Sequence, residues 1–392
     1  MPNKHNIIVD KMLQNAINLL EKLISCDTTS RNSNLEMIEW VETYLTQFGA
    51  RLLRIPNDDG QKTNLVAAFG PEVSGGIVFS GHSDVVPIDG QNWDSNPWVL
   101  TERDGKLFGR GTCDMKGFSA CVLALAPSIA AANLKRPIYY ALSYDEEVGC
   151  IGAPRMIDIM VQNYPPIDAC IVGEPTDMKT VSAHKGIASF VVEITGHEAH
   201  SSRTDKGVSA IMEAIPIMAL IKDLGTSFKS EESIFAPQGT TMTIGLIEGG
   251  TAVNILAHHC KFVFDIRSEQ GFDLDALVAI IRDIVEKTDK SIKARAPDGS
   301  AKLIQRTNTP GLGLDLSSNA EQISRAINGD NEVIAVSFAA EAGLFQARGI
   351  PTIICGPGSI LDAHQPNEYV EIAQLEKCLR YLEQIILRQC QI

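Results

Sequence analysis

Short apolar runs recur through the first half of the chain, and each is followed by a histidine or a carboxylate. The segments GGIVFSG (75–81), RPIYYALSY (136–144) and IDACIVG (167–173) have the length and residue types of buried strands. Helix-like segments, FSACVLALAPSIAAANL (118–134) and APRMIDIMVQNY (153–164), alternate with them. This alternation predicts an α/β fold with a largely parallel sheet covered by helices.

Polar residues follow these predicted strands directly. His82, Glu146 and Glu174 come just after the three runs, and reacting groups in such sheets collect beyond the carboxyl ends of the strands. Three consecutive carboxylates, Asp145, Glu146 and Glu147, follow the second run. Because burying an unpaired carboxylate is costly, the sequence predicts a positive charge at this edge.

The patterning changes near residue 185. IASFVVEITG (187–196) alternates like a half-exposed strand, and a predicted helix (207–224), two strands (241–250 and 258–268) and a second helix (273–287) follow it. This order predicts a ferredoxin-like α+β module. The polar stretch 286–311 is interpreted as a connection back to α/β patterning at 333–356. We therefore predict a catalytic domain formed by 1–184 and 306–392, with a second domain inserted at 185–305.

Composition narrows the class of partner and the compartment. Acidic residues outnumber basic ones by 48 to 34, and the net charge of −14 argues against nucleic acid or an anionic membrane as the main partner. No run approaches the ~18 apolar residues of a membrane span, and the first residues lack the features of a signal peptide. Nine scattered cysteines without a C-x-x-C pair favour reduced thiols and a cytoplasmic protein.

Five polar motifs carry the candidate chemistry: GHSDVVP (81–87), GRGTCDMKG (109–117), DEEVG (145–149), GEPT (173–176) and DAHQPNEY (362–369). Each alone has a simpler explanation, such as a polar turn, a helix cap at Asp114 or a solvated loop. Together they place two histidines and several carboxylates at predicted strand ends, a mixed nitrogen and oxygen ligand set that suits zinc. Close carboxylates push one another toward protonation, and two divalent cations bridged by one of them would remove that penalty.

In this order and at these spacings, the motifs resemble those of the M20 metallopeptidase and deacylase family over essentially the whole chain. The resemblance implies a zinc-peptidase-like catalytic domain with an inserted lid and dimerisation domain, and hence a homodimer. It implies two Zn²⁺ ions per subunit, for which Co²⁺ or Mn²⁺ can substitute. One ion would be held by His82, Asp114 and Glu174, and the second by Asp114, Glu147 and His364.

The resemblance also implies roles beyond the ligands. Glu146 would be the general base for hydrolysis of an amide, and Asp84 would orient His82. The Asp114–Met115 peptide bond is expected to be cis. In the inserted domain, the segment GHEAHSSRTDKG (196–207) matches a family segment whose histidine reaches the scissile carbonyl, and the match falls on His200 rather than His197. In dimeric members that histidine comes from the other subunit.

Substrate contacts are implied at three further positions. Asn254 and Arg267 match family positions that contact the substrate carboxylate, which an arginine can bind with two parallel hydrogen bonds. For Arg267 the alternative is a surface ion pair on a strand. Glu341, in the sequence EAG (341–343), would lie near the amine of a cationic substrate.

The implied substrate is a small N-acyl amino acid. The EAG stretch favours members that cleave N-acetylornithine, in arginine biosynthesis, over those that cleave N-succinyl-diaminopimelate, and general N-acyl-amino-acid deacylases and dipeptidases remain alternatives. A non-catalytic metal-binding homologue is disfavoured, because every expected position is filled. A nucleophilic-cysteine hydrolase using Cys113 or Cys150 is disfavoured too, because the sequence specifies no histidine partner.

Overall fold

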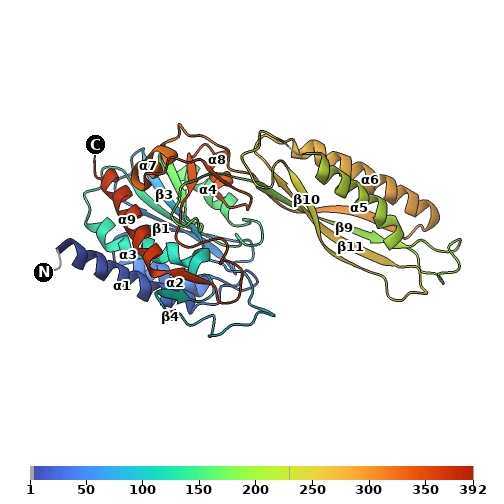
Figure 1. Cartoon of the computed structure of the whole chain (residues 1–392), viewed down its shortest axis with the longest axis horizontal. Coiled ribbons are helices and arrows are strands. Elements are labelled where there is room, and N and C mark those ends of the chain that lie inside the picture. The colour runs from blue at the N-terminus through green and yellow to red at the C-terminus, as the bar shows by residue number, and fades with distance from the viewer. Residues whose placement is uncertain (1–3, 229, 392) are drawn as a thin grey trace. The chain divides into compact units, whose positions relative to one another are not determined.

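The structure is a computed structural model that describes residues 4–228 and 230–391. It divides into two compact units (Figure 1). The first unit comprises 1–183, 312–334 and 340–392, and the second comprises 184–311 and 335–339. The first unit is therefore discontinuous in sequence.

The first unit is built on an eight-stranded sheet in the order β1-β2-β6-β3-β7-β14-β8-β13. The neighbours β6, β3, β7 and β14 are mutually parallel, whereas β1 and β2 join as antiparallel strands. The strands are β1 (Arg51–Pro56), β2 (Thr63–Phe69), β3 (Gly76–His82), β6 (Ile138–Ser143), β7 (Ile167–Val172), β8 (Val181–His184), β13 (Ile334–Val336) and β14 (Thr352–Ile354). The predicted α/β fold with a mostly parallel sheet is confirmed.

A small sheet and several helices complete the first unit. The small sheet has the order β15-β5-β4, with β4 (Thr101–Arg103), β5 (Lys106–Phe108) and β15 (Tyr369–Glu371). The helices are α1 (Lys4–Ile24), α2 (Leu35–Thr46), α3 (Gly117–Ala131), α4 (Ala153–Asn163), α7 (Asn319–Asn328), α8 (Ala342–Ala347) and α9 (Ile372–Gln389), with a π-helical turn η1 (Thr112–Lys116) before α3.

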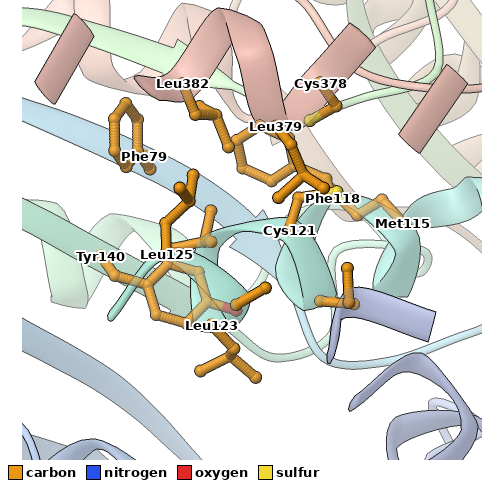
Figure 2. Close-up of a cluster of buried hydrophobic side chains, with 14 of the residues drawn as sticks. Phe79, Met115, Phe118, Cys121, Leu123, Leu125, Tyr140, Cys378, Leu379 and Leu382 are labelled. Atoms are coloured by element: carbon orange, nitrogen blue, oxygen red, sulfur yellow. The ribbon is translucent and has the colours of Figure 1, made fainter. Parts of the chain in front are cut away.

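Helix α3 lies at the centre of the main core. It packs against α1 and α9, and its Phe118 and Leu125 belong to one apolar cluster with Phe79 of β3 and Leu382 of α9 (Figure 2). Among the described residues, one helical stretch, Thr112–Ala131, is long and apolar enough to cross a membrane. Because 83% of its most apolar window is buried in the protein, its place in the core accounts for that composition.

The second unit contains β9 (Gly186–Thr195), α5 (Ala210–Ser227), β10 (Thr241–Gly249), β11 (His259–Ser268), α6 (Leu274–Arg295) and β12 (Ser300–Thr309). Its antiparallel sheet has the order β10-β11-β9-β12, and both helices cover one face (Figure 1). Alternate side chains of the central strands, such as Phe190 and Phe264, are buried with the apolar side of the helices. This βαββαβ order is ferredoxin-like.

The stretch 286–311 differs from its prediction as a polar connection. Helix α6 continues to Arg295 rather than ending at 287, and β12 then adds a fourth strand beside β9. Polar residues dominate β12 because it is an edge strand with little buried side-chain surface, so its strand pattern is weak. As a result the second unit runs to Gly311 rather than ending at 305.

Candidate metal centre

The candidate site lies at the carboxyl edge of three adjacent strands. His82 is the last residue of β3, Glu146 and Glu147 follow β6, and Glu174 follows β7. Because β6, β3 and β7 are parallel neighbours, their carboxyl ends meet at one edge of the sheet. The apolar strand interiors are fully buried, so the chain turns polar only where each strand leaves the core.

Asp114 lies between two imidazoles. Its Oδ1 is 3.0 Å from His82 Nε2 and its Oδ2 is 3.1 Å from His364 Nε2. His364 Nε2 also lies 2.9 Å from Glu147 Oε2, and His82 Nε2 lies 3.6 Å from Glu174 Oε1. Donor atoms about 2.0 Å from a tetrahedral Zn²⁺ would be about 3.3 Å apart, so these separations fit metal ligands.

The hydrogen-bonding state of the carboxylates supports the same fit. Glu147 Oε1 and Glu174 Oε1 are buried and have no hydrogen-bond partner. Such atoms are rare in folded proteins and call for an explanation such as an ion. Two groups of side chains, His82 with Asp114 and Glu147, and His82 with Glu146 and Glu174, bring their ligand atoms within 4.8 Å of one another. These residues therefore fit a divalent cation.

Burial and the crowding of carboxylates together shift the pKa values of the site. Burial, followed by the charges of neighbouring carboxylates, raises the pKa of Glu146 to about 8, and burial together with Asp114 raises that of Glu147 to about 7. Hydrogen bonds to Asp114 and Glu147 raise the pKa of His364 to about 11. Burial is the largest cause of the two glutamate shifts, and nearby carboxylates contribute to all three shifts, so a cation at this position would compensate part of each.

The acidic triplet divides between two environments. Asp145 forms an ion pair with Lys62, at 2.5 Å between Oδ1 and Nζ, so a lysine neutralises this one carboxylate. Glu146 and Glu147 instead approach the metal centre, with Cys150 Sγ donating to Glu146 Oε1 at 3.2 Å. The positive charge predicted at this edge is therefore supplied in part by Lys62.

Asp84 supports His82 through a different atom from the one predicted. The Nδ1 of His82 is 2.9 Å from the main-chain oxygen of Asp84, whereas the Asp84 carboxylate is 3.7 Å away. That carboxylate accepts the main-chain N–H groups of Glu146 and Glu147 and the hydroxyl of Ser30. A donor bond from Nδ1 to the carbonyl leaves Nε2 free to bind metal.

A buried ion pair that the sequence analysis missed holds the Asp114 turn. Glu368 Oε1 accepts the main-chain N–H groups of Cys113 (3.0 Å) and Asp114 (3.2 Å), while Glu368 Oε2 lies 2.6 Å from Arg110 Nη1. Both side chains lie inside predicted motifs, but nothing in a single sequence shows that residues so far apart are paired. The Asp114–Met115 bond is cis, as predicted.

Comparison with known proteins decides the family. Residues 78–388 match the family described as peptidase family M20/M25/M40. The chain belongs to this family. Similar proteins include the acetylornithine deacetylase of Proteus mirabilis, 33% identical over 371 residues that cover 93% of this chain and 92% of that protein. The acetylornithine deacetylase of Myxococcus xanthus is 34% identical over 382 residues, covering 95% and 96%.

Solved structures of similar proteins share the fold. An M20 metallo-carboxypeptidase from Sulfolobus solfataricus superposes with a TM-score of 0.79 at 15% identity, covering 96% of this chain and 99% of that one. The aminopeptidase PepT from Bacillus cereus gives a TM-score of 0.73 at 21% identity, covering 97% and 99%. With its family and its ligand cluster, this M20 protein is a metal-dependent hydrolase that acts on linear amides.

Glu341 is not placed as the substrate contact that was predicted. Its side chain is fully buried, and its two carboxylate oxygens accept the hydroxyls of Ser80 (2.6 Å) and Ser143 (2.9 Å). These serines lie on β3 and β6, so Glu341 joins the two strands that carry His82 and the acidic loop. In this structure the carboxylate is shielded from solvent, and its described contacts are with the protein's own serines.

The second unit contains three of the predicted site residues. It places His200 and Asn254 close together and Arg267 apart from them. His200 forms an isolated bridge with Ile255, and Ser201 N donates to Asn254 O, so the exposed His200 and Asn254 belong to adjoining loops. Arg267 on β11 pairs with Ile187 at the start of β9, and its Nε lies 3.1 Å from Asp265 Oδ2.

The distance along β9 separates these groups. His200 follows the far end of β9, which ends at Thr195, whereas Arg267 lies opposite the beginning. At about 3.3 Å per residue, Ile187, which is paired with Arg267, and Thr195 are about 26 Å apart. Within one second unit, a small substrate therefore cannot touch both Arg267 and His200.

Proposed function

We propose that this M20 enzyme is a two-zinc deacylase that cleaves N-acetylornithine to ornithine and acetate, in arginine biosynthesis. The observation that carries the two-ion proposal is the position of Asp114, which turns one oxygen toward each histidine. On this proposal His82, Asp114 and Glu174 hold one Zn²⁺, and Asp114, Glu147 and His364 hold the other. The similar proteins named acetylornithine deacetylase support the choice of substrate.

Glu146 would act as the base and then as the acid. Bound Zn²⁺ ions would acidify the attacking water and polarise the acyl carbonyl. Burial and neighbouring carboxylates raise the pKa of Glu146 to about 8 in the metal-free protein, and the positive charge of bound Zn²⁺ ions would lower it again, so that the carboxylate form is available as the base. The carboxylate accepts the proton of the attacking water and delivers it to the departing amine. Glu147 and Glu174, with one oxygen each buried without a hydrogen bond, serve as ligands.

We further propose that a homodimer completes the site. The wide separation of Arg267 and His200 along the second sheet supports a partner subunit as the source of His200 and Asn254. Arg267 would bind the substrate carboxylate with its guanidinium group. His200 would donate a hydrogen bond to the oxygen that gains negative charge during attack.

Exposed apolar side chains at the β10 edge of the second unit support this dimer. The edge strand β10 exposes Leu246 (67%) and Ile247 (58%), and the adjacent helix α5 exposes Met212 (63%) and Ile215 (47%). An apolar groove of about 580 Å³ runs between α5 and β10. Exposed edge strands and apolar patches of this kind are typical of association surfaces.

The nine free cysteines favour a reducing, cytoplasmic setting for the enzyme.

A direct rate comparison tests the substrate proposal. The zinc-loaded protein is assayed with N-acetylornithine, N-succinyl-diaminopimelate, N-acetylmethionine and a neutral dipeptide. We expect kcat/KM for N-acetylornithine to exceed the others by at least about 100-fold, the scale on which a few kcal/mol of differential binding discriminates substrates. A higher kcat/KM for the succinylated substrate or for the dipeptide would replace N-acetylornithine as the substrate.

A further inference from the structure

We propose that Gln91 is a positioning residue of the metal centre, which holds the His364 loop and so sets the affinity for one of the two ions. The other ion, bound by His82, Glu174 and the shared ligand Asp114, depends on Gln91 only indirectly, through Arg110 and Glu368. This inference rests on the two-ion site of the proposed function. It concerns the loop between β3 and β4, which contains no metal ligand.

Gln91 uses both ends of its side-chain amide. Its Nε2 donates to the main-chain oxygen of His364 at 2.9 Å. Its Oε1 accepts from Trp93 Nε1 at 3.1 Å and from Arg110 Nη2 at 2.5 Å. Because Trp93 and Arg110 are donors only, the oxygen of the amide must face them and the nitrogen must face His364. The orientation of this amide is therefore fixed by its neighbours.

Arg110 connects Gln91 to Asp114, the ligand that the two proposed ions share. Its fully buried guanidinium group forms an ion pair through Nη1 with Glu368 Oε2. The other carboxylate oxygen of Glu368 accepts a hydrogen bond from the main-chain N–H of Asp114. Arg110 also lies over the ring of Trp93, at 5.1 Å from the ring centre. A continuous set of hydrogen bonds therefore joins the main chains of His364 and Asp114, whose side chains face each other at 3.1 Å.

The two histidines differ in how much support they need. His82 ends a buried strand, has a side chain only 1% exposed and is held at Nδ1 by the carbonyl of Asp84. His364 lies in a loop, has a side chain 53% exposed and adopts a left-handed backbone conformation (φ = 63°) that is unfavourable for a non-glycine residue. A second tie, from Asp94 N to Asn367 Oδ1 at 2.9 Å, joins the same two loops. Loop contacts, rather than the sheet, therefore fix His364.

Removing such support changes metal affinity by a known scale. Mutation of a group that holds a metal ligand in place typically lowers the affinity for the metal by about 10- to 100-fold. Because Gln91 contacts the main chain of His364 directly and reaches the shared ligand Asp114 only through Arg110 and Glu368, the change should fall mainly on the His364 ion. We expect Gln91→Ala to weaken binding of the His364 ion by about 10- to 100-fold and to weaken binding of the other ion by a clearly smaller factor.

Stepwise titration of the metal-free full-length protein with Co²⁺ measures this. The visible spectrum reports how many ions are bound, and competition with a chelator gives each dissociation constant. Asn92→Ala is the matched control, since Asn92 is exposed in the same loop and two-site binding should stay unchanged. If the wild-type protein binds a single ion, the two-ion proposal fails. If it binds two and Gln91→Ala binds both normally, the present inference alone fails.

A variant of His364 separates positioning from a general structural effect. His364→Ala should lose the same ion, and Gln91→Ala added to it should cause no further loss, because Gln91 acts through His364. An equal additional loss in that background would show that Gln91 acts elsewhere. Gln91→Glu keeps the acceptor for Arg110 but loses the donor to His364, so it should resemble Gln91→Ala. Wild-type Co²⁺ affinities for Gln91→Glu would overturn the role of this hydrogen bond.

Discussion

Gly173 allows a quantitative test of how packing beneath the sheet edge positions the metal centre. It lies between β7 and Glu174, and its main-chain N–H donates to Ser80 O at 2.9 Å. A Cβ atom at this position would lie 2.0, 2.2 and 2.4 Å from three ring atoms of Phe118. Favourable carbon–carbon contacts begin near 3.5 Å, so the ring would have to move by about 1.5 Å. Phe118 is fully buried in the cluster of Figure 2 and has little room to do so.

We therefore expect Gly173→Ala to be strongly destabilising. Overpacking a tight core costs about 1–3 kcal/mol, and three simultaneous close contacts place this change near the upper end. For a domain of this size, about 3 kcal/mol lowers Tm by roughly 6–12 °C. The affinity for the ion bound by Glu174 should fall as well, because relief of the clash displaces the residue next to that ligand.

Thermal melting and Co²⁺ titration of Gly173→Ala and of Gly173→Ala/Phe118→Leu measure both effects. The smaller leucine should restore part of the lost stability, so that the double variant melts higher than the sum of the single changes predicts. Gly245→Ala serves as the control, because a Cβ there meets nothing within 4 Å. A Gly173→Ala protein that melts within about 2 °C of wild type, with normal Co²⁺ binding, would refute this packing argument.

Three further predictions follow from the site and the second unit. Glu146→Ala and His200→Ala should each be nearly inactive with metal content retained. An equal mixture of the two variants should recover about one quarter of wild-type activity, because half of the dimers are hybrids and each hybrid has one intact site. No recovery after subunit exchange would place His200 in the same subunit as Glu146. Glu341→Gln should leave KM for N-acetylornithine within about twofold, whereas Glu341→Ala should lower Tm by removing the carboxylate that two buried serine hydroxyls contact. A large rise in KM for Glu341→Gln would restore the substrate-binding role. Burial lowers the pKa of His184 to about 4 from 6.5, so the stabilisation from its neutral form is complete above pH 6.5 and is lost as pH falls toward 4. A pKa shift of one unit corresponds to about 1.4 kcal/mol, so the free energy of unfolding of the metal-free wild type should fall by about 3 kcal/mol more than that of His184→Asn between pH 6.5 and 4. Urea unfolding at a series of pH values measures this, and equal pH dependence of the two free energies would contradict it.

The sequence predicted the elements and ligand types that depend on local pattern. The apolar runs ending at His82, Glu146 and Glu174 are strands at the expected edge, because a buried strand has a strong local signal. Strand β12 was missed because an edge strand with polar side chains lacks that signal. Helix α6 was predicted too short, because its last turns are largely polar and exposed.

Contacts between distant residues were less accessible to sequence reasoning. The H-x-D spacing placed Asp84 near His82, but not the use of its main-chain oxygen, which depends on the exact turn after β3. Glu341 occurs in a segment that suggested a substrate contact, yet its neighbours in space are serines from two strands far away in sequence. Gln91 has no sequence signal at all, because its importance comes from the loop it touches.

The discontinuity of the first unit also has a consequence for synthesis of the protein. Arg110 and its partner Glu368 are 258 residues apart, so at about 5–20 residues per second the ribosome needs about 13–52 s to produce the second after the first. During that interval the second unit, which is nearly continuous in sequence, can fold on the nascent chain, whereas the turn of Asp114 waits for its support. The metal-binding edge is thus among the last parts of the enzyme to mature.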